Sequence, residues 1–91
     1  MWTVVEERGA VKAIDGLPHN IAEKYTAWVN LVRQSGPQAL RSVRGFRDEK
    51  LSGQLAHLRA SRLGIHWRVI YRVESDVVTV TVENITPHVY R

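Results

Sequence analysis

Two strand-like runs in the second half of the chain constrain the fold more than any other feature of the sequence. The runs, 67–74 (WRVIYRVE) and 77–85 (VVTVTVENI), are rich in β-branched and aromatic residues, and only Ser75 and Asp76 separate them. Runs of this composition are typical of β-strands, and so short a separation is typical of a hairpin. A third run, 58–63 (LRASRL), in which apolar and polar residues largely alternate, precedes them. The second half of the chain is therefore predicted to form three antiparallel strands.

The first half of the chain carries a strand signal followed by a helix signal. Residues 2–6 (WTVVE) predict a short strand. From Pro18, a residue suited to the first turn of a helix, apolar residues recur at helical spacing until Gly36 and Pro37, which favour a helix end. A second, short helix is predicted for residues 38–43. The apolar stripe of the long helix consists of Ile21, Tyr25, Trp28, Val29 and Val32. Aromatic residues at this spacing usually belong to a core, so we assign the stripe to the core rather than to base stacking.

The predicted element order, β-α-α-β-β-β, defines an α+β fold in a single domain over residues 1–91. A chain of 91 residues is too short to form two self-sufficient cores. We expect an N-terminal strand and a two-helix hairpin to pack on a small, twisted antiparallel sheet. Alternation along residues 67–74 places Trp67, Val69, Tyr71 and Val73 on one face and Arg68, Ile70 and Arg72 on the other. The sheet is therefore expected to have one face on the helices and one basic face.

Positive charge is concentrated in one segment of the chain. The whole chain carries a formal charge of +4, but residues 41–72 contain eight basic residues against only Asp48 and Glu49. The rest of the chain is slightly acidic. This distribution favours an anionic partner that meets the predicted sheet. The alternative interpretation is an ordinary solvated basic surface, which is common in proteins.

Several classes of function lack their sequence signatures in this chain. It has no cysteine, which excludes disulfides and thiolate zinc sites, and its four histidines lack the spacing of a metal site. No phosphate-binding glycine loop, HExxH, GxSxG or EF-hand pattern occurs. No apolar run approaches the roughly 20 residues of a membrane span. We therefore expect a soluble, cytoplasmic protein with no metal, no small-molecule cofactor and no membrane partner.

The arginines of the predicted strands and the C-terminal residues 86–91 (TPHVYR) are the candidates for chemistry. Cleaving RNA without a metal requires that the 2′-hydroxyl loses a proton, that the charge on the phosphorane is neutralised and that the 5′ oxygen gains a proton. Arginine supplies the charge. Because an imidazole has an unperturbed pKa of about 6.5, His88 is a candidate for moving the proton. Tyr90 can stack on an unpaired base or take part in proton transfer. Taken singly, each of these residues is more often an ordinary surface residue.

Two stretches of the chain resemble a known family. Residues 45–73 (GFRDEKLSGQLAHLRASRLGIHWRVIYRV) and 78–91 (VTVTVENITPHVYR) are similar to the RelE/ParE toxin superfamily, and particularly to its HigB- and YafQ-like members. The matching motifs are a leucine-x-glycine element at 51–53 and an aromatic-Arg-x-x-Tyr strand at 67–71. In pattern the resemblance extends over 17–91. It implies a small antiparallel sheet packed on an N-terminal helical pair.

The resemblance also implies a function, that of the toxin of a type II toxin–antitoxin pair, neutralised by a cognate antitoxin protein. RelE-, HigB- and YafQ-like members cleave messenger RNA on the ribosome by 2′-hydroxyl attack, without a metal cofactor. Transferred by position, the implied catalytic residues are Arg68, Arg62, His88 and Tyr90, with Arg59 as the alternative to Arg62. The candidates for RNA binding are Arg59, Lys50, Arg72 and Arg91. The alternating lysine pair of RelE itself is absent, and since arginine is a poor general base, proton transfer is expected to depend on His88.

Two other functions remain open for the same fold. A ParE-like toxin poisons DNA gyrase by binding and needs no catalytic histidine, so the C-terminal TPHVYR disfavours it. A catalytically inactive member would use its basic sheet only to bind nucleic acid or a protein partner. The expected function is therefore a metal-independent, ribosome-dependent endoribonuclease that arrests growth.

Overall fold

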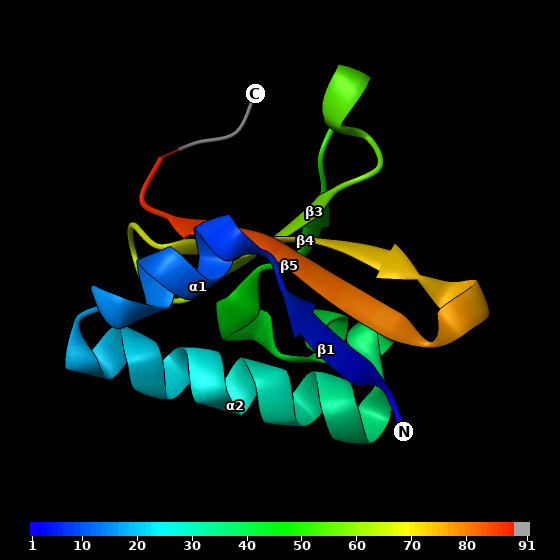
Figure 1. The fold of residues 1–91 in the computed structure, drawn as a ribbon, viewed down its shortest axis with the longest axis horizontal. Helices are drawn as coiled ribbons and strands as arrows, with labels where there is room; N and C mark the ends of the chain where they lie inside the picture. Colours follow the sequence, from blue (N-terminus) through cyan, green and yellow to red (C-terminus); the bar gives the residue numbers. More distant parts are fainter. Residues whose placement is uncertain (89–91) are drawn as a thin grey trace.

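A mixed sheet forms the centre of the structure. Within residues 1–88, the part of the chain that this computed structural model describes, five strands lie in the order β1-β5-β4-β3-β2 (Figure 1). The strands are β1 (Thr3–Glu6), β2 (Glu49–Lys50), β3 (Arg59–Arg62), β4 (Arg68–Glu74) and β5 (Thr79–Thr86). The four predicted strands are confirmed, each within two residues of its expected ends. β2 is too short to leave a periodic signal in the sequence.

The helical part of the described chain differs from the prediction in two respects. Its α-helices are α1 (Arg8–Asp15) and α2 (His19–Ser35). α2 matches the predicted helix and ends at Gly36, which takes a φ of 83°. The segment expected as a second helix forms the 3-10 helix η1 (Pro37–Ser42). The helical hairpin is therefore made by α1 and α2, and α1 was not predicted from the sequence.

The pairing of β1 corrects the expectation of a purely antiparallel sheet. β1 runs parallel to β5, from Thr3 opposite Thr79 to Glu6 opposite Val82. β1 leads into two helices rather than into a tight turn, and such a connection does not impose antiparallel pairing. The other strand pairs are antiparallel, as predicted.

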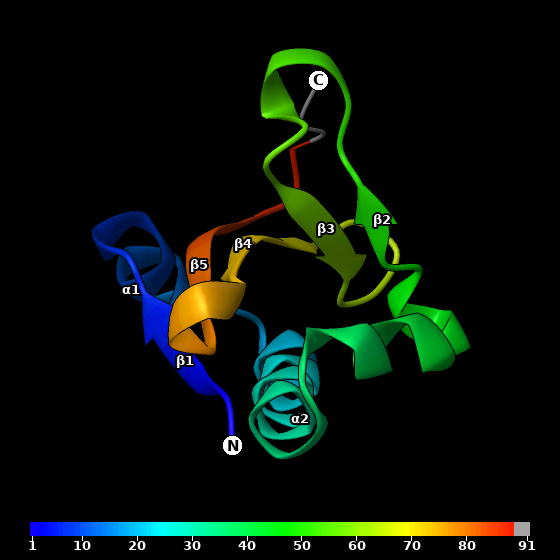
Figure 2. The ribbon, with the colours of Figure 1, turned by 90° about the vertical axis from the view of Figure 1, so that its right-hand side faces the viewer.

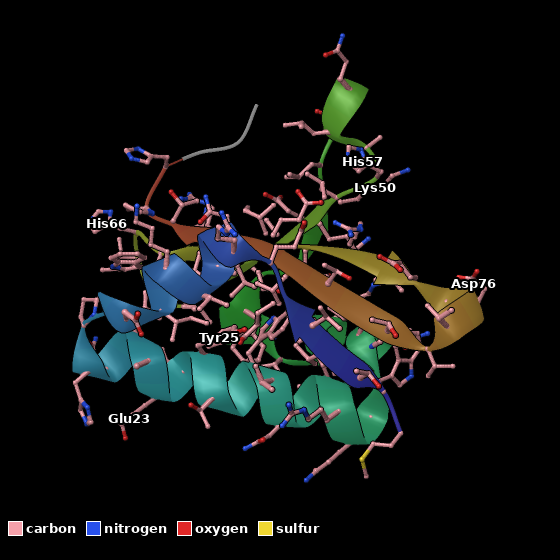
Figure 3. The ribbon with its side chains drawn as sticks, in the orientation of Figure 1. Glu23, Tyr25, Lys50, His57, His66 and Asp76 are labelled. Carbon is pink, nitrogen blue, oxygen red and sulfur yellow. The ribbon has the colours of Figure 1, made fainter. Side chains whose placement is uncertain are left out.

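The connection between β4 and β5 is longer than the predicted two-residue turn. Ser75 and Asp76 belong to the 3-10 helix η4 (Ser75–Val77), which is followed by Val78 in the left-handed region at φ 49°. This connection lies at the end of the hairpin remote from His66 (Figure 3). Thus the hairpin is confirmed, while its turn is a short helix.

The core lies between α2 and the sheet. Ile21, Tyr25, Trp28 and Val32 of α2 are buried, and Tyr25 lies between the helix and the sheet (Figure 3). Trp28 stacks on Tyr25 with ring centroids 5.9 Å apart and meets the ring of Tyr71 edge-on at 5.2 Å. The prediction that this aromatic stripe is core is confirmed.

A β-bulge divides the hairpin of β4 and β5. Ile70 pairs with Asn84 whereas Tyr71 pairs with Val82, so β5 carries one extra residue, Glu83. Such a bulge bends the strand and changes which residues face each side. As a result, both Val82 and Ile85 are buried in the same core cluster.

Two segments rise from the sheet on the side away from α2. They are the end of β5 and the connection from β2 to β3, which contains the 3-10 helix η3 (Gly53–Leu55) (Figures 1 and 2). Leu58, Ala60 and Ile70 form a second, small apolar cluster that anchors this connection, with Leu51 and Leu55 packed against it. Because side chains alternate along a strand, Arg68 and Arg72 lie with Ile70 on this face of the sheet, opposite Val69 and Tyr71 of the core. We refer to it as the basic face. Among the described residues no helix is long and apolar enough to span a membrane.

Candidate functional site

Two arginines lie directly opposite each other on neighbouring strands. Arg62, the last residue of β3, pairs with Arg68, the first residue of β4, and both are partly exposed. Within residues 1–88 neither guanidinium forms an ion pair, and Arg68 Nη1 donates to the backbone carbonyl of His66 at 3.2 Å. Like charges directly opposite in a sheet are destabilising. A bound anion would offset this repulsion.

The row of paired residues continues into β5 and leads to His88. Arg68 pairs on its other side with Thr86, the last residue of β5. Thr86 Oγ1 accepts a hydrogen bond of 3.0 Å from the backbone N–H of His88. This bond holds the chain in a turn just beyond the strand, where His88 is exposed. The structure thus brings Arg62, Arg68 and His88 to one end of the sheet.

Arg59, the alternative to Arg62, forms an ion pair with a buried carboxylate. Its Nε and Nη2 lie 2.9 and 2.8 Å from Oδ2 of Asp48, whose side chain is completely buried. Ser61 donates to Oδ1 of the same carboxylate at 2.7 Å, and the hydroxyl of Tyr71 donates to it as well. Nothing local in the sequence indicates that Asp48 has these three partners.

The electrostatics of this cluster fix the protonation of its members. Burial would lower the pKa of Arg59, but the hydrogen bond and charge of Asp48 outweigh it and raise the pKa. Burial raises the pKa of Tyr71 far above its ordinary value, and the hydrogen bond to Asp48 adds to the shift. Tyr71 therefore remains a neutral donor and Arg59 a fixed cation, both engaged within the fold.

Arg72 is surrounded by carboxylates. It forms ion pairs of 2.9 Å with Glu7, 2.9 Å with Glu74 and 2.6 Å with Glu83. The hydrogen bonds to Glu7 and Glu83 are the main reasons why the pKa of Arg72 is raised. A guanidinium engaged in this way links Glu7, the residue before α1, to the hairpin of β4 and β5. Its geometry gives no support to the prediction that Arg72 binds RNA.

The remaining candidates lie apart from the paired arginines or outside the described residues. Lys50 is exposed on β2 and lies near His57, which belongs to the connection from β2 to β3 (Figure 3). Tyr90 and Arg91 lie outside residues 1–88, so the predictions made for them stay predictions. His66 lies in the connection between β3 and β4, at the end of the sheet where Arg68 begins its strand (Figure 3).

A pocket of about 400 Å³ opens next to Arg62. Its walls come from α2, from the 3-10 helix η2 (Arg44–Phe46) and from the connection between β3 and β4. The lining residues are Lys24, Val43, Gly45, Phe46, Arg47, Arg62, Gly64 and Ile65. No sequence pattern indicates this pocket, because its residues come from three segments that only the fold brings together.

The fold is similar to that of several solved toxins. RelE in the RelE–RelB complex from Pyrococcus horikoshii superposes with a TM-score of 0.74 at 23% identity, over 94% of this chain and 93% of that one. The YoeB/ParE toxin from Agrobacterium tumefaciens gives a TM-score of 0.77 at 16% identity, over 96% and 99%. The YoeB–YefM complex from Staphylococcus aureus gives 0.74 at 15% identity, over 98% and 99%. No protein-family model and no curated protein sequence matches the chain.

These similarities cover nearly the whole of each chain. The structure therefore has the α+β fold of the small toxins found in toxin–antitoxin complexes. More specifically, its fold is similar to that of the solved RelE and YoeB toxins. The fold that the resemblance implied is confirmed.

Proposed function

We propose that this chain is the toxin of a type II toxin–antitoxin pair and that it cleaves messenger RNA on the ribosome. The observation that carries the proposal is the cross-strand pair Arg62 and Arg68, which is free of carboxylates within residues 1–88 and adjoins the turn that bears His88. Other strand arginines, Arg59 and Arg72, are neutralised by carboxylates. The positive charge left uncompensated on the sheet is therefore concentrated where a phosphodiester would need it.

The proposed reaction is an internal transesterification. The 2′ oxygen attacks the adjacent phosphorus, the bond from phosphorus to the 5′ oxygen breaks, and the products are a 2′,3′-cyclic phosphate and a 5′-hydroxyl. One proton leaves the 2′-hydroxyl and one joins the 5′ oxygen. Two guanidiniums beside the phosphate stabilise the additional negative charge of the phosphorane. No metal ion is required for this balance of charge and protons.

His88 is the proposed proton-transfer residue. Arginine remains protonated near neutral pH, so Arg62 and Arg68 are poor bases. Tyr71 is buried with a raised pKa and donates to Asp48, so it is unavailable for the reaction. His88 is exposed two residues beyond Thr86, the pairing partner of Arg68. Tyr90 retains the role that the resemblance implies, in which it orients or stacks on a base.

We also propose a protein antitoxin as the partner of this chain. The similar chains in the RelE–RelB and YoeB–YefM structures are each in complex with a second protein. An antitoxin that covers the basic face would neutralise the toxin, and its action in the cytoplasm would follow from the need for translating ribosomes.

The test is to map RNA 5′ ends in cells soon after the wild-type chain or its Arg68→Ala variant is induced. The proposal predicts new 5′ ends confined to translated regions for the wild type and none for the variant. Double-strand DNA breaks with intact RNA would instead indicate a gyrase poison, and uninterrupted growth with intact RNA would indicate an inactive binding protein. Either of these results would overturn the proposal.

A further inference from the structure

The pocket beside Arg62 has the size and position of a ligand site. Its volume of about 400 Å³ lies within the range of about 300 to 1,000 Å³ typical of small-molecule pockets. Arg62 belongs both to this pocket and to the cross-strand pair with Arg68. A ligand in the pocket would therefore lie next to the phosphate held by the two arginines.

The pocket is lined by cations that have no carboxylate partner. Lys24, Arg47 and Arg62 come from α2, from the residue after η2 and from β3, and no acidic residue lines the pocket. In the described part of the chain none of the three forms an ion pair. Arg59 and Arg72, by contrast, are each held by carboxylates. The charge around this pocket is thus available for an anionic ligand.

The remaining wall of the pocket is apolar and open. Phe46 is partly buried, and Ile65 is 82% exposed at the rim. Gly45 has no atom within 4 Å of where a Cβ would lie, while the backbone of Gly64 approaches α2 so closely that a Cβ would be 3.1 Å from Ile21 Cδ1. Proteins hold nucleotides of single-stranded RNA with aromatic rings and with cations that have no carboxylate partner. The pocket offers both, together with open space beside Gly45.

We infer that this pocket binds one nucleotide of single-stranded RNA that flanks the scissile bond, with its base against Phe46 and its phosphate near Lys24 and Arg47. The inference rests on the proposed function, which makes RNA the substrate of the neighbouring arginines. An acidic peptide of a protein partner is the competing occupant. The nucleotide is favoured because Arg62 is shared with the arginine pair and because the pocket holds about one nucleotide.

The test compares Lys24→Gln with Lys12→Gln. Lys12 is exposed on α1 and does not line the pocket, so its substitution makes the same change of charge elsewhere. The affinity of each full-length variant for a fluorescent RNA heptamer with 2′-O-methyl groups is measured over a series of salt concentrations. Lys24→Gln should weaken binding and reduce the slope of log K against log salt by about 0.7, the value for one phosphate contact on a single strand. Lys12→Gln should leave both unchanged.

A second variant tests the base contact. Phe46→Leu keeps an apolar side chain against the core but removes the aromatic ring, and should weaken binding of the heptamer about tenfold, as expected for the loss of one stacked base. Circular dichroism and thermal unfolding establish that each variant is folded. Equal affinities for the Lys24, Phe46 and Lys12 variants would overturn the inference.

Cleavage on translating ribosomes, measured with the same variants, separates the inference from the proposed function. If the wild type binds RNA through the pocket but never cleaves it, the proposed function fails, while the assignment of the pocket to a nucleotide of single-stranded RNA stands. If all variants cleave and bind RNA like the wild type, the inference fails and the proposed function stands. A loss of antitoxin binding alone would assign the pocket to the protein partner and also overturn the inference.

Discussion

The carboxylate of Asp48 and the guanidinium of Arg59 form a two-nitrogen ion pair in which both contacts, of 2.9 and 2.8 Å, converge on Oδ2. The other carboxylate oxygen accepts hydrogen bonds from Ser61 and Tyr71. Asp48 immediately precedes β2, whereas its partners lie on β3 and β4. The fully buried side chain of Asp48 therefore links three consecutive strands, β2, β3 and β4. It also supports the connection from β2 to β3, which borders the basic face.

The first prediction concerns the stability that this cluster provides. Asp48→Ala leaves the cation of Arg59 and the hydroxyls of Ser61 and Tyr71 without their acceptor. Breaking a buried ion pair by removing one partner costs about 3 to 5 kcal/mol, and the free energy of unfolding measured in urea should fall by this amount. Asp76→Ala, in the exposed η4, should change it by less than about 0.5 kcal/mol. Similar values for the two variants would contradict the structural role assigned to Asp48.

The second prediction concerns alkaline pH. The pKa values of Tyr25 and Tyr71 are raised, mainly by burial and further by the carboxylates of Glu6 and Asp48. A group whose pKa is higher in the folded state contributes stability that is complete below its unfolded pKa, about 10 for tyrosine, and is lost as the pH rises. Stability should therefore fall above about pH 10. Tyrosinate absorbance of the two buried rings should appear only together with the loss of circular dichroism. Their ionisation in a folded protein would show that the shifts are absent.

The third prediction concerns the strained turn of the hairpin. Val78 adopts φ 49° although its side chain is β-branched, and it is 43% exposed. Asparagine tolerates this region far better than valine does. Val78→Asn should therefore stabilise the protein by about 1 kcal/mol. Val77→Asn, at a neighbouring exposed residue without a positive φ, is the control and should give no gain in urea denaturation.

The fourth prediction distinguishes the two kinds of strand arginine. Because Arg72 is held by Glu7, Glu74 and Glu83, Arg72→Gln should leave the affinity for RNA unchanged. It should lower stability by about 1 kcal/mol, an effect that salt diminishes because the pairs are partly exposed. Arg68→Gln should weaken RNA binding and spare stability. An equal loss of RNA affinity in both variants would show that Arg72 takes part in RNA binding and would contradict this distinction.

The sequence predicted those parts of the fold that depend on local patterns. Alternation identified β4 and β5, and helical spacing identified α2, because burial of one face imposes a period on the residues. α1 left only a short signal, with Ala10, Ala13 and Ile14 at helical spacing between two glycines. The parallel pairing of β1 with β5 joins segments more than 70 residues apart, and no local pattern specifies such a pairing.

The candidate site, like the fold, could be predicted from the sequence only in part. Residue type and resemblance were enough to propose Arg62, Arg68 and His88 as candidates. They were not enough to separate these from Arg59 and Arg72, because the difference lies in carboxylates that the fold brings to two of the arginines. Asp48 is 11 residues from Arg59 and 23 from Tyr71, and Glu7 is 65 from Arg72. Only the three-dimensional structure shows which cations are already neutralised.

The most direct test of the proposed chemistry is single-turnover cleavage of messenger RNA on purified translating ribosomes by the wild type, Arg68→Ala, His88→Ala and Arg72→Gln. Loss of the phosphate contact should slow cleavage by about 100- to 1,000-fold and loss of the proton-transfer residue by about 100- to 10,000-fold, while Arg72→Gln cleaves like the wild type. The products should carry 2′,3′-cyclic phosphate and 5′-hydroxyl ends. Uncut RNA with the folded wild type, or equal rates for the wild type, Arg68→Ala and His88→Ala, would contradict the account.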